Sequence, residues 1–267
     1  MNTKDLFLPL RQEKPRKHGL TLLIDNGVPV QFFIDTITSS AEFVDYVKFG
    51  WGTSVVTKHL REKIHCLKEN DISFFFGGTL FEKFLSQQKI DDYYLYCREY
   101  GCRHVEISNG TISLPNKEKA KYITDFSKEF TVFSEVGSKD HVQSEKKDSA
   151  EWIECIQEDF AAGAYKVITE TRESGTSGLC RENGQIRLQL VEDIVASGLN
   201  IYDIVFEAPT KALQTLFIKM IGSNVNLGNI SFTHVIPVET LRLGLRSDTF
   251  NIMQHDFRWR GMHERQK

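Results

Sequence analysis

The sequence lacks the cysteine and histidine patterns of disulfide-rich and zinc-binding proteins. Its 267 residues include five cysteines, an odd number, and none of them have C-x-x-C spacing. The eight histidines form no H-x-x-x-H or H-E-x-x-H pair. No G-x-S-x-G motif of a serine hydrolase is present, and Cys180 has no evident base beside it. These absences argue against a disulfide framework, a zinc site and nucleophilic catalysis, and they favour a reducing cytoplasm.

Long apolar runs and a strong net charge are also absent. No stretch approaches the eighteen apolar residues of a transmembrane helix, and the first residues have no apolar segment typical of a signal peptide. The formal net charge is −3, which does not indicate a protein that coats nucleic acid or an anionic membrane. We therefore expect small molecules as partners, with no nucleic acid and no membrane.

What the sequence contains is one pattern repeated eight times. A short β-branched or aromatic run ends in a small or charged cluster, and a helical stretch follows it. The expected strands are 20–24, 46–49, 72–76, 104–107, 131–134, 165–168, 203–206 and 225–227. Helical patterns include 116–130, 150–162 and 209–221, of which the last begins with a proline, a residue suited to the first helical turn.

This alternation predicts the α/β class with parallel strands joined by right-handed crossovers. The chain length fits the roughly 250 residues of a (β/α)₈ TIM barrel. A doubly wound open sheet would fit the alternation too, but no G-x-G-x-x-G follows the first strand. We predict a single barrel domain over residues 1–267, with short extensions at about 1–18 and 247–267.

The C-terminal extension carries apolar side chains among charges. Phe257, Trp259 and Met262 follow Phe250 in this tail. We expect a homo-oligomer, in which the tail either packs on a neighbouring subunit or caps its own barrel.

Polar residues at the strand ends are the candidates for chemistry, because barrel enzymes draw catalytic groups from several strand C-termini. They are Asp25, Lys48, Glu106, Glu135, Lys139, Glu170, Arg172, Glu207 and Asn226. The five carboxylates among them would repel one another without cations. We expect the basic residues and a divalent metal to compensate, and carboxylates with few histidines suit Mg²⁺. Each charged residue also has a purely structural reading, as a helix cap or an ion-pair partner.

Lys48 differs from the other candidates because it lies within a strand. With Val47 and Phe49 on one face, its side chain points to the other face, into the barrel. A lone buried lysine is costly, so we expect a charged partner.

Two loops offer groups that suit an anion. The glycine- and hydroxyl-rich loop after the sixth strand supplies backbone N–H groups, hydroxyls and a forked guanidinium, from Arg172, Ser174, Gly175, Ser177 and Gly178. The turn after the eighth strand, with Asn226 and Asn229, lies where barrels often bind phosphate. Arg242 and Arg246 either add charge there or are solvated helix-face arginines.

Together these segments resemble the phosphosulfolactate synthase family. The most specific combination is K-F-G-W-G-T at 48–53 with R-E-S-G at 172–175. Further matches lie at 77–82, 105–110, 135–137, 206–209, 225–227 and 239–250. They span nearly the whole chain and keep their order.

The resemblance implies a (β/α)₈ lyase that adds sulfite to C3 of phosphoenolpyruvate in a Mg²⁺-dependent reaction. The product is (2R)-phospho-3-sulfolactate, which serves coenzyme M or sulfolactate biosynthesis. The family's acid is a lysine shortly after the fifth strand, and Lys139 matches it here. It would protonate C2 of an enolate-like intermediate.

For the other candidates we expect roles that fit this reaction. Lys48 and Glu106 join Lys139 as catalytic residues. Glu135, Asp25 and Glu207 are the expected metal ligands, with Glu207 as an ion-pair partner in the other reading. Lys48, Arg172, the loop from Ser174 to Gly178 and the turn from Asn226 to Asn229 would neutralise or bind the substrate anions.

Two other functions fit the same pattern. One is a lyase or aldolase acting on a phosphorylated enol or keto acid, with Lys166 forming a Schiff base. We expect Lys166 at the start of its strand, however, and so far from the mouth of the barrel. The other is a non-catalytic, stress-related barrel of the same family.

Overall fold

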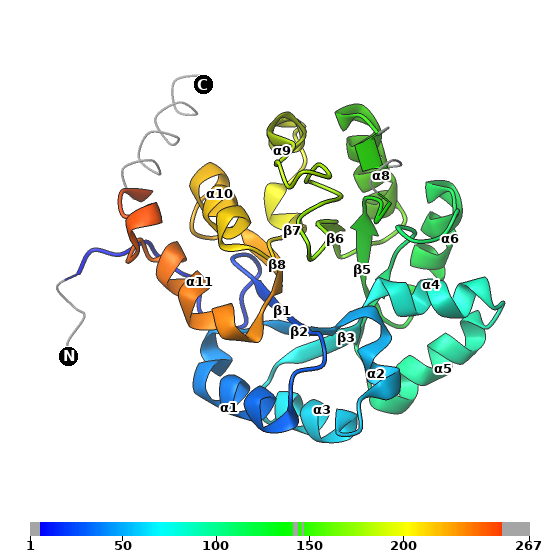
Figure 1. The fold of residues 1–267 in the computed structure, drawn as a ribbon. Coiled ribbons are helices and arrows are strands. Elements are labelled where there is room, and N and C mark those ends of the chain that lie inside the picture. Colours follow the sequence, from blue (N-terminus) through cyan, green and yellow to red (C-terminus); the bar gives the residue numbers. More distant parts are fainter. Residues whose placement is uncertain (1–5, 141–143, 146, 253–267) are drawn as a thin grey trace.

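The computed structural model describes residues 6–140, 144–145 and 147–252, which form the barrel drawn in Figure 1. The described residues contain eight strands. They are β1 (Thr21–Asp25), β2 (Tyr46–Phe49), β3 (Ser73–Phe76), β4 (His104–Ile107), β5 (Thr131–Val136), β6 (Lys166–Thr169), β7 (Ile204–Glu207) and β8 (Asn226–Ile230). The tail residues Phe257, Trp259 and Met262 lie outside the described part of the chain.

All strand pairs are parallel, in the order β3-β2-β1-β8-β7-β6-β5-β4. The strands β3 and β4 stand at the two ends of this order, and among the described residues no ladder joins them. They nevertheless lie next to each other, so the sheet curls into a nearly closed barrel with helices around it. The predicted (β/α)₈ fold is confirmed.

Helices alternate with the strands along the chain. They are α1 (Val30–Ser40), α2 (Thr53–Val56), α3 (Leu60–Glu69), α4 (Gly78–Ser86), α5 (Ile90–Tyr100), α6 (Asn116–Phe126), α8 (Ser149–Ala161), α9 (Leu188–Ala196), α10 (Lys211–Ile221) and α11 (Val235–Arg242). Short 3₁₀ turns lie at Ala41–Phe43, Gly50–Gly52, Ile201–Asp203, Phe232–His234 and Ser247–Thr249. Among the described residues, no helix has the length and apolar character needed to cross a bilayer.

Four predicted element ends were wrong by two residues or more. The helical stretch 116–130 ends at Phe126, and the strand 131–134 continues to Val136. The helix expected to begin with Pro209 begins at Lys211, because the Thr210 side chain caps it by accepting from the Leu213 N–H group at 3.4 Å. The eighth strand does not end at Leu227 but continues to Ile230.

Strand alternation divides the barrel interior into layers. An apolar layer of inward side chains is formed by Leu20, Leu22, Phe75, Phe133, Ile168 and Val205, with Tyr46 packed against it. Two residues further along the same strands, the inward positions are Lys48, Glu135, Glu170 and Glu207. Because side chains along a strand alternate with a period of two, a charged layer lies on the apolar layer. The charged layer is the one nearer the C-terminal ends of the strands. The predicted inward direction of Lys48 is confirmed.

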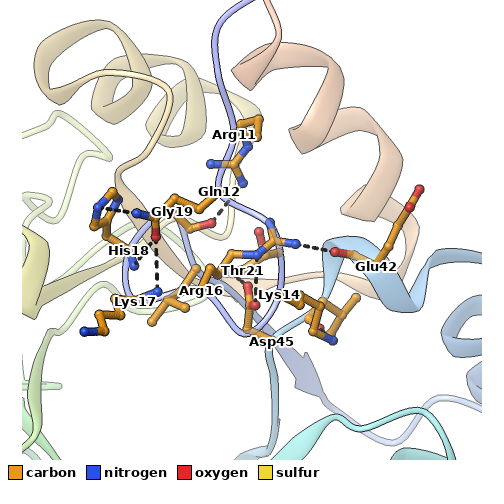
Figure 2. A network of polar contacts seen from close by, with 12 residues as sticks. Arg11, Gln12, Lys14, Arg16, Lys17, His18, Gly19, Thr21, Glu42 and Asp45 are labelled. Atoms are coloured by element: carbon orange, nitrogen blue, oxygen red, sulfur yellow. Dashed lines mark hydrogen bonds and ion pairs between the residues drawn. The ribbon is translucent and has the colours of Figure 1, made fainter.

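The opposite end of the barrel is closed by the segment that precedes β1, whose polar contacts are shown in Figure 2. Arg11 forms an ion pair with Glu239 on α11 at 2.8 Å. Arg16 pairs with Asp45 at 3.2 Å, and Lys14 donates to the carbonyl groups of Ala41 and Val44. The described part of the expected N-terminal extension is therefore the floor of the barrel.

Arg242 also belongs to this floor and not to the mouth, which corrects the expectation that it adds charge to a phosphate site. Its guanidinium is buried and donates to the carbonyl groups of Ser223 at 2.8 Å, Val225 at 2.6 Å and Leu20 at 3.0 Å. These contacts join α11 to the starts of β1 and β8.

We predict that Arg242→Met lowers the free energy of unfolding by about 3 kcal/mol, because the substitution leaves buried carbonyl groups without donors. Urea unfolding midpoints measure this loss. Arg61→Met is the matched control, because Arg61 forms an exposed ion pair with Glu99. Such pairs contribute little, so the control should change stability by less than about 1 kcal/mol. Equal effects of the two substitutions would contradict the structural role of Arg242.

Candidate active site

A cavity of about 820 Å³ opens at the C-terminal ends of the strands. Its wall is formed mainly by strand ends and the loops that follow them, the location of the active site in barrel enzymes. The charged residues in the wall are Lys48, Glu106, Glu135, Lys139, Asp140, Glu170, Arg172, Glu173 and Glu207.

Two lysines organise the buried charges of this cavity, and each lies between two glutamates. The Lys48 ammonium is 2.8 Å from Glu207 Oε1 and 3.3 Å from Glu106 Oε2. The Lys139 ammonium is 2.6 Å from Glu135 Oε1 and 3.4 Å from Glu170 Oε2. The structure therefore brings together groups from β2, β4, β5, β6 and β7, with the expected charged partner of Lys48 present twice.

Two of these carboxylates also accept a hydrogen bond from a backbone N–H group, through the oxygen that does not face Lys48. Glu106 Oε1 accepts from the Gly78 N–H group at 2.8 Å, and Glu207 Oε2 accepts from that of Thr171 at 2.8 Å. Such contacts fix the direction of the carboxylates before any substrate binds.

The site has more buried negative than positive charge. Burial raises the pKa of Glu106 to about 7, and it raises the pKa of Glu207 and, more strongly, that of Glu170. Glu135 differs, because the ammonium groups of Lys139 and Lys48 outweigh its burial and lower its pKa to about 2. Burial opposes the charge of Lys139, but Glu135 and Glu170 hold the pKa of its ammonium well above the ordinary value.

Three of the glutamates could hold a metal ion. Glu135, Glu170 and Glu207 are buried, and each offers a carboxylate oxygen within 4.8 Å of the others. Converging oxygen ligands with surplus negative charge suit a hard divalent cation.

The structure places Asp25, an expected metal ligand, outside this group. Its carboxylate pairs with Lys63 at 2.6 Å and accepts from the N–H groups of Gly27 and Val28. It is not among the residues that form the cavity wall, where β1 is represented by Ile24. Because Ile24 faces inward, the next residue along the strand faces the surrounding helices. Glu170 occupies the position expected of Asp25.

The loop after β6 contributes part of what was expected. Arg172 and Ser174 line the cavity. Gly175 lies at a turn with φ 68°, while the Ser177 hydroxyl donates to the Ser138 carbonyl at 2.6 Å. A Cβ atom at Gly178 would lie 2.0 Å from the Glu170 carbonyl oxygen. Ser177 and Gly178 thus shape the loop and do not face the cavity, contrary to their predicted role in binding substrate.

The two asparagines of β8 lie at opposite ends of the strand. Asn226 is fully buried at its start and donates to the carbonyl groups of Tyr202 and Ile204. Its predicted contact with substrate was wrong, because the strand runs three residues further than expected. Asn229 lines the cavity, and its buried Oδ1 has no hydrogen-bond partner among the described residues.

Several cavity residues were not identified as site residues from the sequence. Trp51, in the left-handed region with φ 49°, lines the mouth together with Gly78, Thr79 and Thr111. Their signal was their position, since each directly follows a predicted strand or its turn. The Glu82 carboxylate lies behind the cavity wall. Glu82 does not directly follow a predicted strand or its turn, so its position gave no such signal.

Comparison with known proteins connects this site to one family. The model of the (2R)-phospho-3-sulfolactate synthase (ComA) family matches residues 9–248. The phosphosulfolactate synthase of Bacillus subtilis (strain 168) is 58% identical over 250 residues, which cover 94% of this chain and 99% of the relative. That of Methanocaldococcus jannaschii is 40% identical over 238 residues, covering 88% and 94% of the two chains.

Solved structures with low sequence identity share the fold. The YdjI aldolase from Escherichia coli K12 aligns with a TM-score of 0.52 at 11% identity, covering 81% of this chain and 76% of that chain. A dihydropteroate synthase from Coxiella burnetii aligns with a TM-score of 0.53 at 10% identity, covering 85% and 93%. At such identities the likeness concerns the fold alone.

The family match extends over all eight strands, and the Bacillus subtilis relative aligns over nearly its whole length. The sequence resemblance and the expected enzymatic class are thus confirmed: the chain belongs to the (2R)-phospho-3-sulfolactate synthase family of enzymes.

Proposed function

We propose that the chain is a lyase that adds sulfite to C3 of phosphoenolpyruvate and forms (2R)-phospho-3-sulfolactate. The observation that carries this proposal is the charge cluster at the mouth, in which two ammonium groups and four buried carboxylates face one cavity. It consists of Lys48, Lys139, Glu106, Glu135, Glu170 and Glu207. This arrangement suits a reaction in which anionic substrates pass through a state of higher negative charge.

The bond changes define what the site must do. The sulfur lone pair of sulfite forms a C–S bond at C3, and the C2–C3 π electrons move onto C2 and the carboxylate. A proton then bonds to C2 from one face, which sets the configuration of the product. The site must therefore stabilise an enolate-like dianion and supply one proton.

We propose Mg²⁺ as the cofactor, held by Glu135, Glu170 and Glu207. Their converging oxygens and surplus charge fit a hard cation. When bound, the ion supplies positive charge that neutralises the enolate and the substrate carboxylate. Glu170 takes the role expected of Asp25 in this proposal.

Lys139 is the proposed acid. Its side chain lines the cavity and is partly exposed, while its ammonium lies between Glu135 and Glu170. When these carboxylates share their charge with a cation, the pKa of Lys139 should fall from its raised value, which favours proton transfer. Lys48, held by Glu106 and Glu207, remains a fixed positive charge toward the substrate.

The remaining cavity groups suit the substrate oxyanions. Arg172 offers a forked guanidinium and Ser174 a hydroxyl, both at the mouth. The Asn229 side chain, with its unpartnered Oδ1, can turn its amide toward a substrate oxygen. We propose that these groups bind the phosphate and sulfonate.

A Schiff-base mechanism has no support from the position of Lys166. Its ammonium donates to the Tyr202 carbonyl at 2.9 Å and to Asp203 at 3.3 Å. Both partners precede β7, so Lys166 lies at the end of the barrel opposite the cavity.

The cytoplasm and a homo-oligomer remain proposals for this chain. All five cysteines are free thiols, as suits a reducing compartment. Phe7 and Phe250 are 92% and 73% exposed, which leaves apolar surface for a neighbouring subunit to cover.

Purified protein should consume phosphoenolpyruvate only when sulfite and Mg²⁺ are both present, without release of inorganic phosphate. Lys139→Ala should lower kcat by about 10²- to 10⁴-fold, because the proton donor is removed. The decrease in phosphoenolpyruvate absorbance measures both effects.

Lys128→Ala serves as control, since Lys128 forms an exposed pair with Asp125, and it should keep full activity. Absence of turnover in the unmodified protein would refute the proposed reaction. Full activity of Lys139→Ala would refute the assignment of the acid.

The metal site separates Glu170 from Asp25. Glu170→Gln should raise the Mg²⁺ concentration for half-maximal activity by at least about 10-fold. Substitution of a residue that only supports a metal ligand already costs about 10- to 100-fold in metal affinity or activity. Asp25→Asn should lower thermal stability through its lost pair with Lys63 and leave the Mg²⁺ dependence unchanged. Titration of activity with Mg²⁺ checks both, and the reverse pattern would restore Asp25 as a ligand.

The stability of the metal-free protein should depend on pH. The pKa of Glu106 is about 7 in the folded chain, whereas an unfolded glutamate has a pKa of about 4.3. The folded state therefore binds more protons between these values, and stability falls as pH rises through them. Thermal melts in a chelator should show a falling Tm between about pH 5 and 7, and Mg²⁺ should raise Tm more above this range than below it. A Tm that rises with pH throughout this range would contradict the assignment.

A further inference from the structure

The barrel wall has a seam between β3 and β4, where no ladder joins the described residues. Near the mouth, α4 spans this seam by side-chain contacts. The Gly78 N–H group at the start of α4 donates to Glu106 at the end of β4. One turn further along α4, Glu82 Oε1 accepts from the Ser108 hydroxyl at 2.5 Å. Contacts from α4 thus replace the missing backbone ladder.

Glu82 is the centre of this connection. It is 1% exposed, and its second oxygen accepts from the N–H groups of Thr111 at 2.7 Å and Ile112 at 2.8 Å. Among the described residues it forms no ion pair, and three hydrogen bonds take the place of a counter-ion. A carboxylate that makes such contacts ties the loop 108–112 to α4.

The loop 108–112 in turn contacts the proposed acid. The Gly110 carbonyl accepts from the Lys139 N–H group at 3.0 Å. A Cβ atom at Gly110 would lie 3.5 Å from Glu135 Oε1 and 3.6 Å from Lys139 Cγ. The Gly110 backbone therefore lies beside Lys139 and close to its partner carboxylate, and a shift of the loop would disturb the Lys139 backbone that it binds.

We propose that Glu82 is a positioning residue, which holds the loop 108–112 in place so that Gly110 keeps Lys139 between Glu135 and Glu170. Glu82 does not line the cavity, and its hydrogen bonds to this part of the site are made to the loop. The catalytic consequence rests on the proposed function, whereas the positioning itself does not.

The substitution Glu82→Met, which keeps a side chain of similar length, tests the connection. Methionine offers no oxygen acceptor to the three donors. Displacement of a catalytic group by about 1 Å can cost about 100-fold in rate. We expect a 10- to 100-fold lower kcat, about as large as that displacement allows, with KM for phosphoenolpyruvate changed by less than about 3-fold.

Amide hydrogen exchange reads out the positioning without any substrate. In Glu82→Met, exchange at Thr111 and Ile112 should accelerate, because these groups lose their acceptor. Exchange at Lys139, whose N–H group bonds to Gly110 of the loop, should accelerate with them. Unchanged exchange at Lys139, with faster exchange at Thr111 and Ile112, would overturn the proposal.

Two further variants separate positioning from stability. Asp45→Asn alters a buried carboxylate in the floor that accepts from the Thr21 N–H group at 2.8 Å. It should lower Tm without changing amide exchange at Lys139. It should also not show the selective decrease in kcat, at nearly constant KM, that is expected of the Glu82 variant. Ser108→Ala removes one of the three donors to Glu82 and should accelerate Lys139 exchange to a smaller extent, with kcat lowered by about 3-fold.

If Glu82→Met fails to fold, Ser108→Ala decides, and normal exchange at Lys139 in that variant would overturn the proposal. The proposed reaction fails separately. An unmodified protein that does not consume phosphoenolpyruvate would remove the reaction, while the exchange data would still decide whether Glu82 positions Lys139.

Discussion

The structure depends on the pairing of two lysines with four glutamates at the open end of the barrel. None of these groups would keep its charge at such depth alone, because burial penalises ions without partners. Lys48 and Lys139 each lie between two carboxylates, and backbone N–H groups hold Glu106 and Glu207 from the other side. The pairing fixes the geometry but leaves an excess of carboxylates. That excess would attract a divalent cation, and in the proposed mechanism the cation and the two ammonium groups offset the negative charge that accumulates on the substrate.

The two ends of the barrel have different tasks. Arg11 and Arg16, which Figure 2 shows, hold the N-terminal segment in the floor. Arg242 forms hydrogen bonds there that join α11 to the strands. The mouth instead gathers the charged groups that face the cavity. Barrels commonly separate stability from chemistry in this way. Substitutions in the floor should therefore affect folding, whereas those in the mouth should affect the reaction.

Much of the fold and part of the site could be predicted from the sequence, because both follow strand alternation. The inward direction of Lys48 follows from Val47 and Phe49, and the same rule applied to Ile24 would have directed Asp25 outward. Asn226 was misplaced because no signal marked the end of β8 at Ile230. The contacts of Glu82 and Ser177 could not be predicted, since their partners come from loops 26 to 39 residues away whose paths depend on tertiary packing.

The apolar layer beneath the charged layer determines how small molecules enter and leave the barrel. Leu22, Phe75, Phe133, Ile168 and Val205 fill the barrel below the glutamates, so the interior is not a channel between its two ends. Both reactants must arrive, and the product must leave, by way of the mouth. A bound product therefore obstructs the next turnover, and how quickly the surrounding loops release it sets an upper limit on the rate, however fast the chemical step is.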